Sequence, residues 1–323
     1  MALLEEPEAN SNSFSFFPNS PFILFGSFQT LCLIIGFLWI AIKLHYFLKL
    51  IYIEVFRPEK DLKERYGSGS FALITGASDG IGKAFCFSLA KRGFNIVLVA
   101  RSQLKLHEVE KELKSKFPSI QVRVIVANFM EANQDGFFAR ILEEIKDLDV
   151  SILVNNVGIG YINYLADLSE TELKETVTVN CVPQIVLSKH LMEKFLLRKK
   201  KSCIITISSI SVDFPLEAHQ VYGATKAFND HFSRTVALEY SEVDSISVKP
   251  ALVDTNMSKS YKKKYLPITP EECAEGTLRK VGYENMTFGH WKHVLLYEMS
   301  KLIPEEMRNS NSKKYFVEPK KSR

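Results

Sequence analysis

A tyrosine and a lysine that could exchange a proton lie four residues apart, as Tyr222 and Lys226 in the sequence YGATK. On an α-helix this spacing places both side chains on one face, one turn apart. A phenol has a pKa of about 10 in water, which makes it a poor acid or base at neutral pH. Because a neighbouring ammonium favours the phenolate, the pattern predicts that Lys226 lowers the pKa of Tyr222 and that the pair serves general acid–base catalysis.

Further polar side chains that could contact the same substrate atom precede this pair. Ser208 and Ser209 follow an apolar run, and Asn180 interrupts the apolar pattern TVTVNCV of a predicted helix. Ligands of parallel α/β sheets bind at the carboxyl ends of strands, so a serine there could hydrogen-bond the carbonyl oxygen that Tyr222 reaches. Ordinary capping of the strand end is the alternative, and it applies to at least one of the two serines.

A glycine-rich turn, TGASDGIG, follows the first predicted strand. Glycines let the backbone turn sharply and approach a pyrophosphate closely, and the free N–H groups that begin the next helix then face an anion. A plain strand-to-helix turn is the alternative, but its place at the head of an alternating strand–helix pattern favours dinucleotide binding. The residues expected to bind the cofactor here are Gly76, Ser78, Asp79, Gly80, Ile81 and Gly82.

The residue after the second predicted strand indicates which dinucleotide is preferred. A carboxylate is usual at this point in proteins that bind NAD, because it accepts hydrogen bonds from the ribose hydroxyls. This chain has Arg101 instead, with Lys105 nearby. A guanidinium forks well onto a phosphate, so Arg101 favours NADP(H) over NAD(H). The alternative is that Arg101 is only a solvated loop residue.

The elements that must position these residues alternate along the chain. Short apolar runs separated by longer amphipathic stretches predict βαβ units, and hence a Rossmann-type α/β fold, a doubly wound parallel sheet with helices on both faces. The predicted strands are Ala72–Thr75, Asn95–Ala100, Val122–Ala127, Ile152–Asn155, Cys203–Ser208 and Ser245–Lys249. The predicted helices are Ile81–Arg92, Ser102–Lys116, Phe137–Lys146, Glu170–Leu197 and Tyr222–Tyr240.

Length and composition fit one large α/β domain with appendages, or two modest domains. The chain has 323 residues, of which 46% are hydrophobic and 24% are charged, and these values exclude wholesale disorder. A formal net charge of +4, with acids mixed among the bases, gives no support for nucleic-acid binding. The five cysteines are dispersed and form no CxxC pair, which argues against disulfides and a structural zinc site and favours a reducing compartment.

An uncharged apolar segment near the N-terminus, from Phe22 to Ile42, is long enough to cross a bilayer. A secretory signal peptide and a buried soluble helix are the alternatives. The leader is acidic, and no small-residue cleavage site follows, so we expect an uncleaved membrane anchor. Basic residues follow the segment and none precedes it, which places the rest of the chain in the cytosol.

These features divide the chain into five expected segments. Residues 1–20 form a lumenal tail, and residues 21–56 form the transmembrane anchor and a juxtamembrane helix. Residues 57–70 are a linker or a short helix that ends in a loop. Residues 71–258 form the Rossmann NADP-binding catalytic domain. Residues 259–323 form a substrate lid and a membrane-proximal segment with a basic tail, within which His293–Met307 is apolar enough to lie on a membrane or to cap a pocket.

In their order and spacing, TGASDGIG, NNVG, Asn180, Ser209 and YGATK resemble the short-chain dehydrogenase/reductase family over about residues 68–258. The resemblance implies that Tyr222 is the general acid or base and that Lys226 lowers its pKa and bonds the nicotinamide ribose. It also implies that Ser209 orients the substrate carbonyl and that Asn180 holds a water of a proton relay. In that family the pro-S hydride of the cofactor is transferred.

The resemblance also implies cofactor contacts elsewhere in the chain. Val253 and Thr255 would contact the nicotinamide carboxamide and the phosphates, and Asn155 belongs to the NNVG motif of the cofactor site. Two positions depart from the family pattern. Ala251 replaces a glycine in the loop after the sixth strand, and Asn128 stands where an aspartate usually contacts adenine, although an amide can still hydrogen-bond there.

Within the family the chain is most similar to the membrane-bound branch of very-long-chain 3-oxoacyl-CoA reductases and 17-beta-hydroxysteroid dehydrogenases of types 3 and 12. This resemblance implies a single-pass protein of the endoplasmic reticulum membrane with a cytosolic catalytic domain. The chain ends in KKSR, which resembles a dilysine retrieval signal, although a solvated basic end is the alternative. Fatty-acid elongase components are among the partners implied. Dimers are common in the family, so a homodimer is compatible with the resemblance.

The expected reaction is the reduction by NADPH of the ketone of a very-long-chain 3-oxoacyl-CoA, the first reduction of an elongation cycle. A 17-oxosteroid or retinoid reductase is the alternative enzyme, because the catalytic residues do not distinguish these substrates. A catalytically silent membrane scaffold is the alternative of another class, and the presence of Ser209, Tyr222 and Lys226 argues against it.

Overall fold

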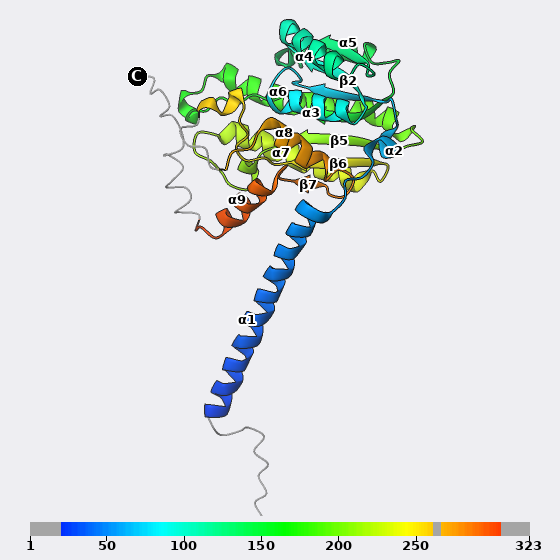
Figure 1. Ribbon diagram of the computed structural model, residues 1–323. Coiled ribbons are helices and arrows are strands. Elements are labelled where there is room, and N and C mark those ends of the chain that lie inside the picture. Colours follow the sequence, from blue (N-terminus) through cyan, green and yellow to red (C-terminus); the bar gives the residue numbers. More distant parts are fainter. Residues whose placement is uncertain (1–20, 261–265, 305–323) are drawn as a thin grey trace, which may run out of the picture. The chain divides into compact units, whose positions relative to one another are not determined.

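A computed structural model describes residues 21–260 and 266–304 of the chain (Figure 1). The predicted lumenal tail and the C-terminal KKSR sequence lie outside the described residues. The chain forms two units, residues 1–57 and residues 58–323, which are described separately below.

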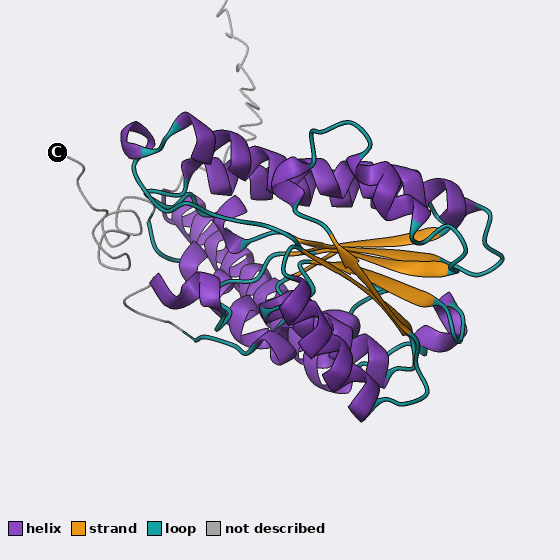
Figure 2. Cartoon of the chain, turned by 90° about the horizontal axis from the view of Figure 1, so that it is seen from above, coloured by secondary structure: helices purple, strands orange, loops and turns teal. Residues whose placement is uncertain are grey.

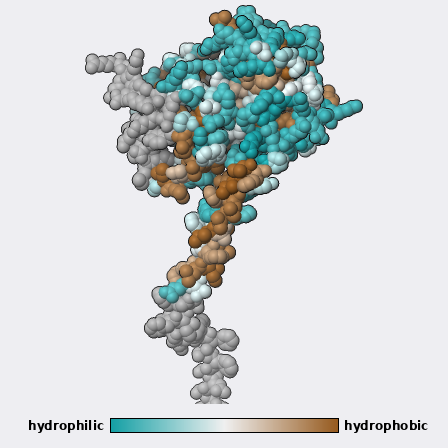
Figure 3. Space-filling model, in the orientation of Figure 1, coloured by the Kyte–Doolittle hydropathy of each residue, from teal (hydrophilic) through white to brown (hydrophobic). Residues whose placement is uncertain are grey.

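The described part of the first unit is one long helical segment. Helix α1 spans Pro21–Ile51 and continues into the π-helical segment η1, Tyr52–Phe56. Among the described residues, Phe28–Phe56 is the one stretch long and apolar enough to cross a membrane, with a mean hydropathy of 2.1. Its described side chains are mostly exposed, and the helix is coloured hydrophobic over most of its length in Figure 3. The helix covers the residues at which the sequence predicts an anchor.

The second unit is built on a parallel sheet with the strand order β3-β2-β1-β4-β5-β6-β7. The chain adds β2 and then β3 on one side of β1. It then crosses back to place β4 on the other side of β1, and β5, β6 and β7 follow outward from β4. The sheet therefore has its topological switch point between β1 and β4, where α/β sheets bind ligands. The strands are β1 Phe71–Thr75, β2 Asn95–Ala100, β3 Val122–Val126, β4 Val150–Asn155, β5 Ser202–Ile207, β6 Val243–Val248 and β7 Met286–Thr287.

Helices cover both faces of this sheet, as the edge-on view in Figure 2 shows. The helices of the second unit are α2 Leu62–Tyr66, α3 Gly80–Lys91, α4 Gln103–Lys116, α5 Phe137–Glu143, α6 Glu170–Leu196, α7 Gln220–Glu239, α8 Pro270–Leu278 and α9 Trp291–Lys301. One core cluster packs α2, α3, α4 and α8 on one face, and a second packs α5, α6 and α7 on the other. The predicted doubly wound fold is confirmed.

The apolar strands explain why both faces are covered. Successive side chains of a strand point to opposite faces, so a strand buried on both sides is apolar throughout. In β1, Ile74 belongs to the first core cluster and Leu73 to the second, and every residue of the strand is buried. The six predicted strands match β1 to β6 within two residues at each end.

The segment from residue 57 to 70 contains α2, so the short helix is the correct alternative there. Leu62 and Tyr66 are buried in the first core cluster. The Tyr66 hydroxyl donates to Asp244 Oδ2 at 2.5 Å, and Arg65 Nη2 donates to Asp244 Oδ1 at 2.8 Å. These contacts tie α2 to the start of β6, and the segment is part of the folded domain rather than a free linker.

The folded domain also extends past residue 258, where the sequence predicted its end. Strand β7 pairs with β6, and α8 packs against α3, so part of the predicted lid completes the sheet. Both elements are short, which is why the alternating pattern weakens there. Gly276 of α8 lies against the backbone that follows β7: a Cβ atom at this position would be 1.8 Å from Gly289 O.

We predict that Gly276→Ala destabilises the domain by about 1–3 kcal/mol, because the contacted atom is a backbone carbonyl that cannot move away cheaply. Thermal or urea unfolding of the purified protein measures the change. Gly223→Ala is the matched control, since the nearest atom to its added Cβ is Ser211 O at 3.9 Å. Equal stability of the Gly276 variant and the wild type would contradict the close packing of α8.

Candidate active site

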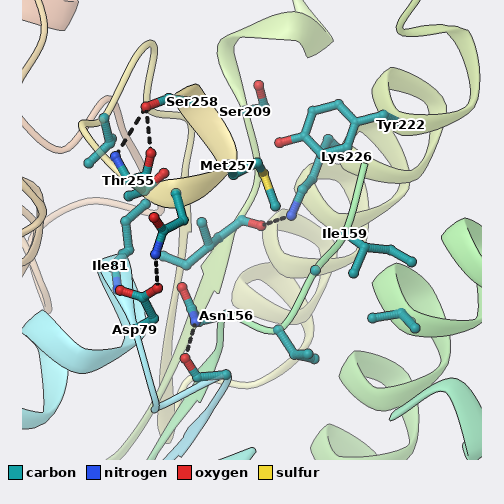
Figure 4. Close-up of a pocket in the computed structure, with 18 of the residues that line it drawn as sticks. Asp79, Ile81, Asn156, Ile159, Ser209, Tyr222, Lys226, Thr255, Met257 and Ser258 are labelled. Atoms are coloured by element: carbon teal, nitrogen blue, oxygen red, sulfur yellow. Dashed lines mark hydrogen bonds between the residues drawn. The ribbon is translucent and has the colours of Figure 1, made fainter. Parts of the chain in front are cut away.

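A pocket of about 590 Å³ lies at the carboxyl ends of the strands. Residues that follow each of the first six strands line it, as expected for a sheet of this topology. Figure 4 shows the lining side chains, with the turn after β1 on one side and helix α7 on the other. The pocket joins the two groups of residues that the sequence predicts separately, the glycine-rich turn and the Tyr222–Lys226 pair.

The turn between β1 and α3 forms a tight backbone cradle. Asp79 caps α3, and its Oδ1 accepts a hydrogen bond from Gly80 N at 2.7 Å. Gly82 is required because a Cβ there would lie 2.3 Å from Gly76 O and 2.4 Å from Asn156 Nδ2. The first turn of α3 therefore closes onto the end of β1 and leaves the N-terminus of the helix facing the pocket. Five of the six predicted turn residues line the pocket, and Gly82 lies behind it.

The far end of the pocket carries the residues predicted to recognise the adenosine part of a dinucleotide. Arg101, directly after β2, and Lys105, in the first turn of α4, line it, and both are exposed. Asn128 lines it after β3, where its Oδ1 accepts a hydrogen bond from Met130 N at 3.3 Å. Two cations at the end of β2 make this part of the pocket suited to an anionic group.

Tyr222 and Lys226 lie one turn apart on α7, as the spacing predicts. Lys226 is 4% exposed, and its Nζ donates a hydrogen bond to Ile207 O at 2.8 Å. Its Nζ lies 5.7 Å from the centre of the Tyr222 ring. Tyr222 is half-buried, and Figure 4 shows its ring beside Lys226 and Ser209. The ammonium is thus fixed next to the phenol within the pocket.

The pKa values of the pair differ from the sequence-based expectation. Burial raises the pKa of Tyr222 to about 12, and a hydrogen bond with Ser209 opposes this by less. Burial also lowers the pKa of Lys226 to about 8. Desolvation is the largest cause of both shifts, because each charged form loses its water. The phenol is therefore protonated at neutral pH, which suits it to donate a proton rather than to accept one.

The two serines after β5 have different environments. Ser208 is buried, and its Oγ donates to Lys226 O at 2.7 Å, so it holds α7 against the strand. Ser209 lines the pocket, and its Oγ accepts hydrogen bonds from Ser211 N at 3.2 Å and from the Ser211 hydroxyl at 3.0 Å. The structure thus places Ser209 beside Tyr222 and uses Ser208 for packing.

Asn180 lies behind the pocket wall and is 2% exposed. Its Oδ1 accepts from Ile159 N at 2.8 Å, and its Nδ2 donates to Ile159 O at 2.9 Å and to Thr225 Oγ1 at 2.9 Å. The amide therefore joins the loop after β4 to α7, next to Lys226. This contact explains a polar residue on a packing face of α6, and its water-holding role stays a prediction.

Of the two asparagines of the NNVG motif, Asn156 lines the pocket and Asn155 does not. The Asn155 side chain points away from the pocket, and its Nδ2 donates to Ser188 Oγ at 3.1 Å. Asn156, which the sequence analysis did not single out, lines the pocket and donates from Nδ2 to Thr75 O at 2.9 Å. The two side chains thus have different surroundings at the end of β4, and a cofactor contact of Asn155 stays a prediction.

The loop after β6 closes the pocket on its remaining side. Val253 and Thr255 line it, together with Met257 and Ser258, which the sequence did not indicate. Ala251 N donates to His293 Nδ1 of α9 at 3.1 Å, and this contact fixes the loop at the position where the family usually has glycine. Burial lowers the pKa of His293 to about 4, so the imidazole is neutral and can accept this bond.

A doubly wound sheet with a tight glycine turn, a helix N-terminus at the pocket and a tyrosine–lysine pair is the arrangement of a dinucleotide-binding oxidoreductase. The comparisons with known proteins agree. Residues 70–266 match the family model of the short chain dehydrogenases. The chain belongs to this family.

Individual relatives refine this picture. The chain is 34% identical over 255 residues to a very-long-chain 3-oxoacyl-CoA reductase of Caenorhabditis briggsae, covering 77% of this chain and 80% of the relative. It is 33% identical to the inactive hydroxysteroid dehydrogenase-like protein 1 of Homo sapiens, covering 80% and 79%. A solved structure of a 7beta-hydroxysteroid dehydrogenase superimposes with a TM-score of 0.70 at 24% identity, over 79% of this chain and 100% of that one, which shows the shared fold.

We predict that kcat/KM for ketone reduction falls as the pH rises through about 8. Below this pH Lys226 is charged, since its pKa is lowered to about 8, and above it the charge beside Tyr222 is lost. Tyr222 itself stays protonated over this range. Steady-state rates from pH 6 to 10 measure the profile, in which kcat/KM reports groups of the free enzyme.

The variant Lys226→Met is the control for this profile, because it cannot titrate and should be slow at every pH. A wild-type rate that stays constant to about pH 10 would remove Lys226 from the proton chemistry.

Proposed function

We propose that the protein is an NADPH-dependent ketoreductase that acts on a lipid-type substrate, with a very-long-chain 3-oxoacyl-CoA as the first choice. The observation that carries this proposal is the buried Lys226 ammonium beside a protonated Tyr222 and the Ser209 hydroxyl, in the same pocket as the glycine cradle. This arrangement can donate a proton to a carbonyl oxygen that becomes negatively charged.

The pocket fits a nicotinamide dinucleotide. At Gly82 the turn and the loop after β4 lie so close together that a side chain would not fit between them. We infer that a pyrophosphate would be bound here by backbone N–H groups of the turn. Asn128 would contact the adenine, and Arg101 would bind a 2′-phosphate, which favours NADP(H). Val253 and Thr255 would contact the nicotinamide end, and Lys226 its ribose.

When bound, NADPH would supply the hydride for the carbonyl carbon of the substrate. Ser209 and Tyr222 then donate hydrogen bonds to the carbonyl oxygen as negative charge develops on it. Tyr222 delivers the proton, and the charge of Lys226 stabilises the tyrosinate that is left. Because burial disfavours an isolated tyrosinate, the charge of Lys226 is worth more here than it would be in water.

A membrane location supports the choice of an amphiphilic substrate. We propose that α1 anchors the chain in the endoplasmic reticulum membrane, with the catalytic domain in the cytosol, because no basic residue precedes the helix while Lys43 and Lys49 lie toward its end. The relative from Caenorhabditis briggsae is named for a 3-oxoacyl-CoA substrate, which favours the elongation cycle and elongase partners for this chain. A 17-oxosteroid or a retinoid is the alternative substrate.

A catalytically silent role is the second candidate, since one relative carries the word inactive in its name. In this chain, however, Ser209 and Tyr222 line the pocket, and Lys226 is fixed beside them by the bond to Ile207 O. The intact arrangement favours an active enzyme.

We predict that Tyr222→Phe lowers kcat/KM for reduction at least about 10²-fold, because it removes the proton donor. The affinity for NADPH should stay nearly unchanged, since the ring is kept. The loss of NADPH absorbance with a long-chain 3-oxoacyl-CoA measures turnover, and fluorescence titration measures cofactor binding. Tyr161→Phe is the matched control, because the Tyr161 hydroxyl bonds Glu175 at 2.6 Å and does not line the pocket.

Persistent turnover by the Tyr222 variant would exclude Tyr222 as the acid. Oestrone and androstenedione in the same assay test the alternative substrates. If the wild type binds NADPH but turns over none of these ketones, the silent role is favoured.

We also predict that Arg101→Asp weakens NADPH binding about 10- to 100-fold and shifts the preference toward NADH, because a charged hydrogen bond to the 2′-phosphate is lost and replaced by repulsion. Titration with both cofactors measures the ratio of the two dissociation constants. Arg123→Asp is the matched control, since Arg123 lies on β3 outside the pocket, 3.6 Å from Glu144. An unchanged ratio for the Arg101 variant would refute the assignment.

A further inference from the structure

Helix α9 has an inner face that packs against the loops of the active site. His293 accepts the hydrogen bond from Ala251 N, as described above. Tyr297 contacts Phe214 and Phe288, with ring centres 5.4 Å and 4.4 Å apart, respectively. These contacts fix the rotation of the helix about its axis, so its opposite face is directed away from the domain core.

That opposite face is apolar. Four of its side chains follow one another at helical spacing and form what we name the α9 stripe. The stripe consists of Trp291, Leu295, Met299 and Leu302, which are 50%, 44%, 53% and 81% exposed. Helix α4 differs from α9 in this respect, because most of the exposed side chains of α4 are charged or polar. A contiguous apolar stripe on a water-soluble domain marks an interaction surface.

The chemistry around the stripe favours a lipid bilayer as its partner. Lys292 and Lys301 lie on the same helix, and tryptophan and lysine are the side chains that prefer the interface between lipid and water. The sequence that follows α9 carries six basic residues and one acidic residue between Arg308 and Arg323. An apolar stripe followed by a basic segment gives the two signals that together hold a surface on an anionic membrane.

The position of the stripe in the chain agrees with this partner. Only residues 57–61 separate η1 from α2 along the chain, so a membrane-embedded α1 would keep the catalytic domain at a bilayer. This step rests on the proposed anchor, whereas the exposure of the stripe does not.

We propose that the α9 stripe is a membrane-binding surface that inserts into the headgroup region of an anionic bilayer. It lies on the reverse side of the helix that holds the Ala251 loop and Phe214, so the active-site loops would rest against a membrane-bound element. A lipid substrate would then reach the pocket beside the bilayer surface.

The two tryptophans of the chain make a direct test possible, because Trp39 lies in α1 and Trp291 in the stripe. In the full-length variant Trp39→Phe, Trp291 is the sole tryptophan. The variant is reconstituted into vesicles of phosphatidylcholine and phosphatidylserine, with or without bromine on the acyl chains. We expect the brominated lipids to lower Trp291 emission about twofold or more, since an interfacial helix buries its apolar face below the headgroups.

Two further variants serve as controls. Trp291→Phe leaves Trp39 as the reporter of the anchor. Leu238→Trp, made in a chain without Trp39 and Trp291, places the reporter on α7 at a position 81% exposed, and its emission should not change.

Quenching of Trp291 without quenching at position 238 supports the proposal. Unquenched Trp291 emission would overturn it, and a blue shift without quenching would show that the stripe contacts a second copy of this chain instead. If Trp39 alone is quenched, the anchor holds and the stripe does not bind lipid. If Trp39 is not quenched, the proposed anchor fails independently of the result for Trp291.

Discussion

The burial of one ammonium group beside one phenol is the constraint on which the rest of the site depends. Lys226 has lost nearly all contact with water, and its Nζ donates to the Ile207 carbonyl at the end of β5. Its charge is costly in this environment, which lowers its pKa to about 8, and it becomes most favourable when a negative charge appears next to it. In the proposed reaction, proton donation by Tyr222 would create that charge, and the Lys226 ammonium would stabilise it.

The fold holds this pair by hydrogen bonds from three elements. Ser208 at the end of β5 bonds the carbonyl of Lys226, and Asn180 of α6 joins Thr225 of α7 to the loop after β4. The parallel sheet brings the ends of β4 and β5 to the same edge as the glycine turn after β1. Residues more than a hundred positions apart in the chain therefore meet in one pocket, and the glycine turn and Tyr222 line it together without a second domain.

The strands, the main helices and most of the residues that line the pocket could be predicted from the sequence because they follow local patterns. The predictions failed where a tertiary contact decides. The choice between Asn155 and Asn156 depends on which side of β4 faces the pocket, and the pKa of Tyr222 depends on desolvation that no spacing encodes. Strand β7 is two residues long and exists through its pairing with β6. The sequence of α9 does not show which of its apolar side chains face the domain. The contacts of His293 and Tyr297 decide this, because they fix the rotation of the helix about its axis.

The most direct test of the account is the fate of the hydride. The full-length protein is incubated with a long-chain 3-oxoacyl-CoA and NADPH that carries deuterium at the pro-S position of the nicotinamide ring, and the product is analysed by mass spectrometry. The account predicts a 3-hydroxyacyl-CoA with one deuterium on the former carbonyl carbon. A product without deuterium, or no product while NADPH is bound, would contradict it.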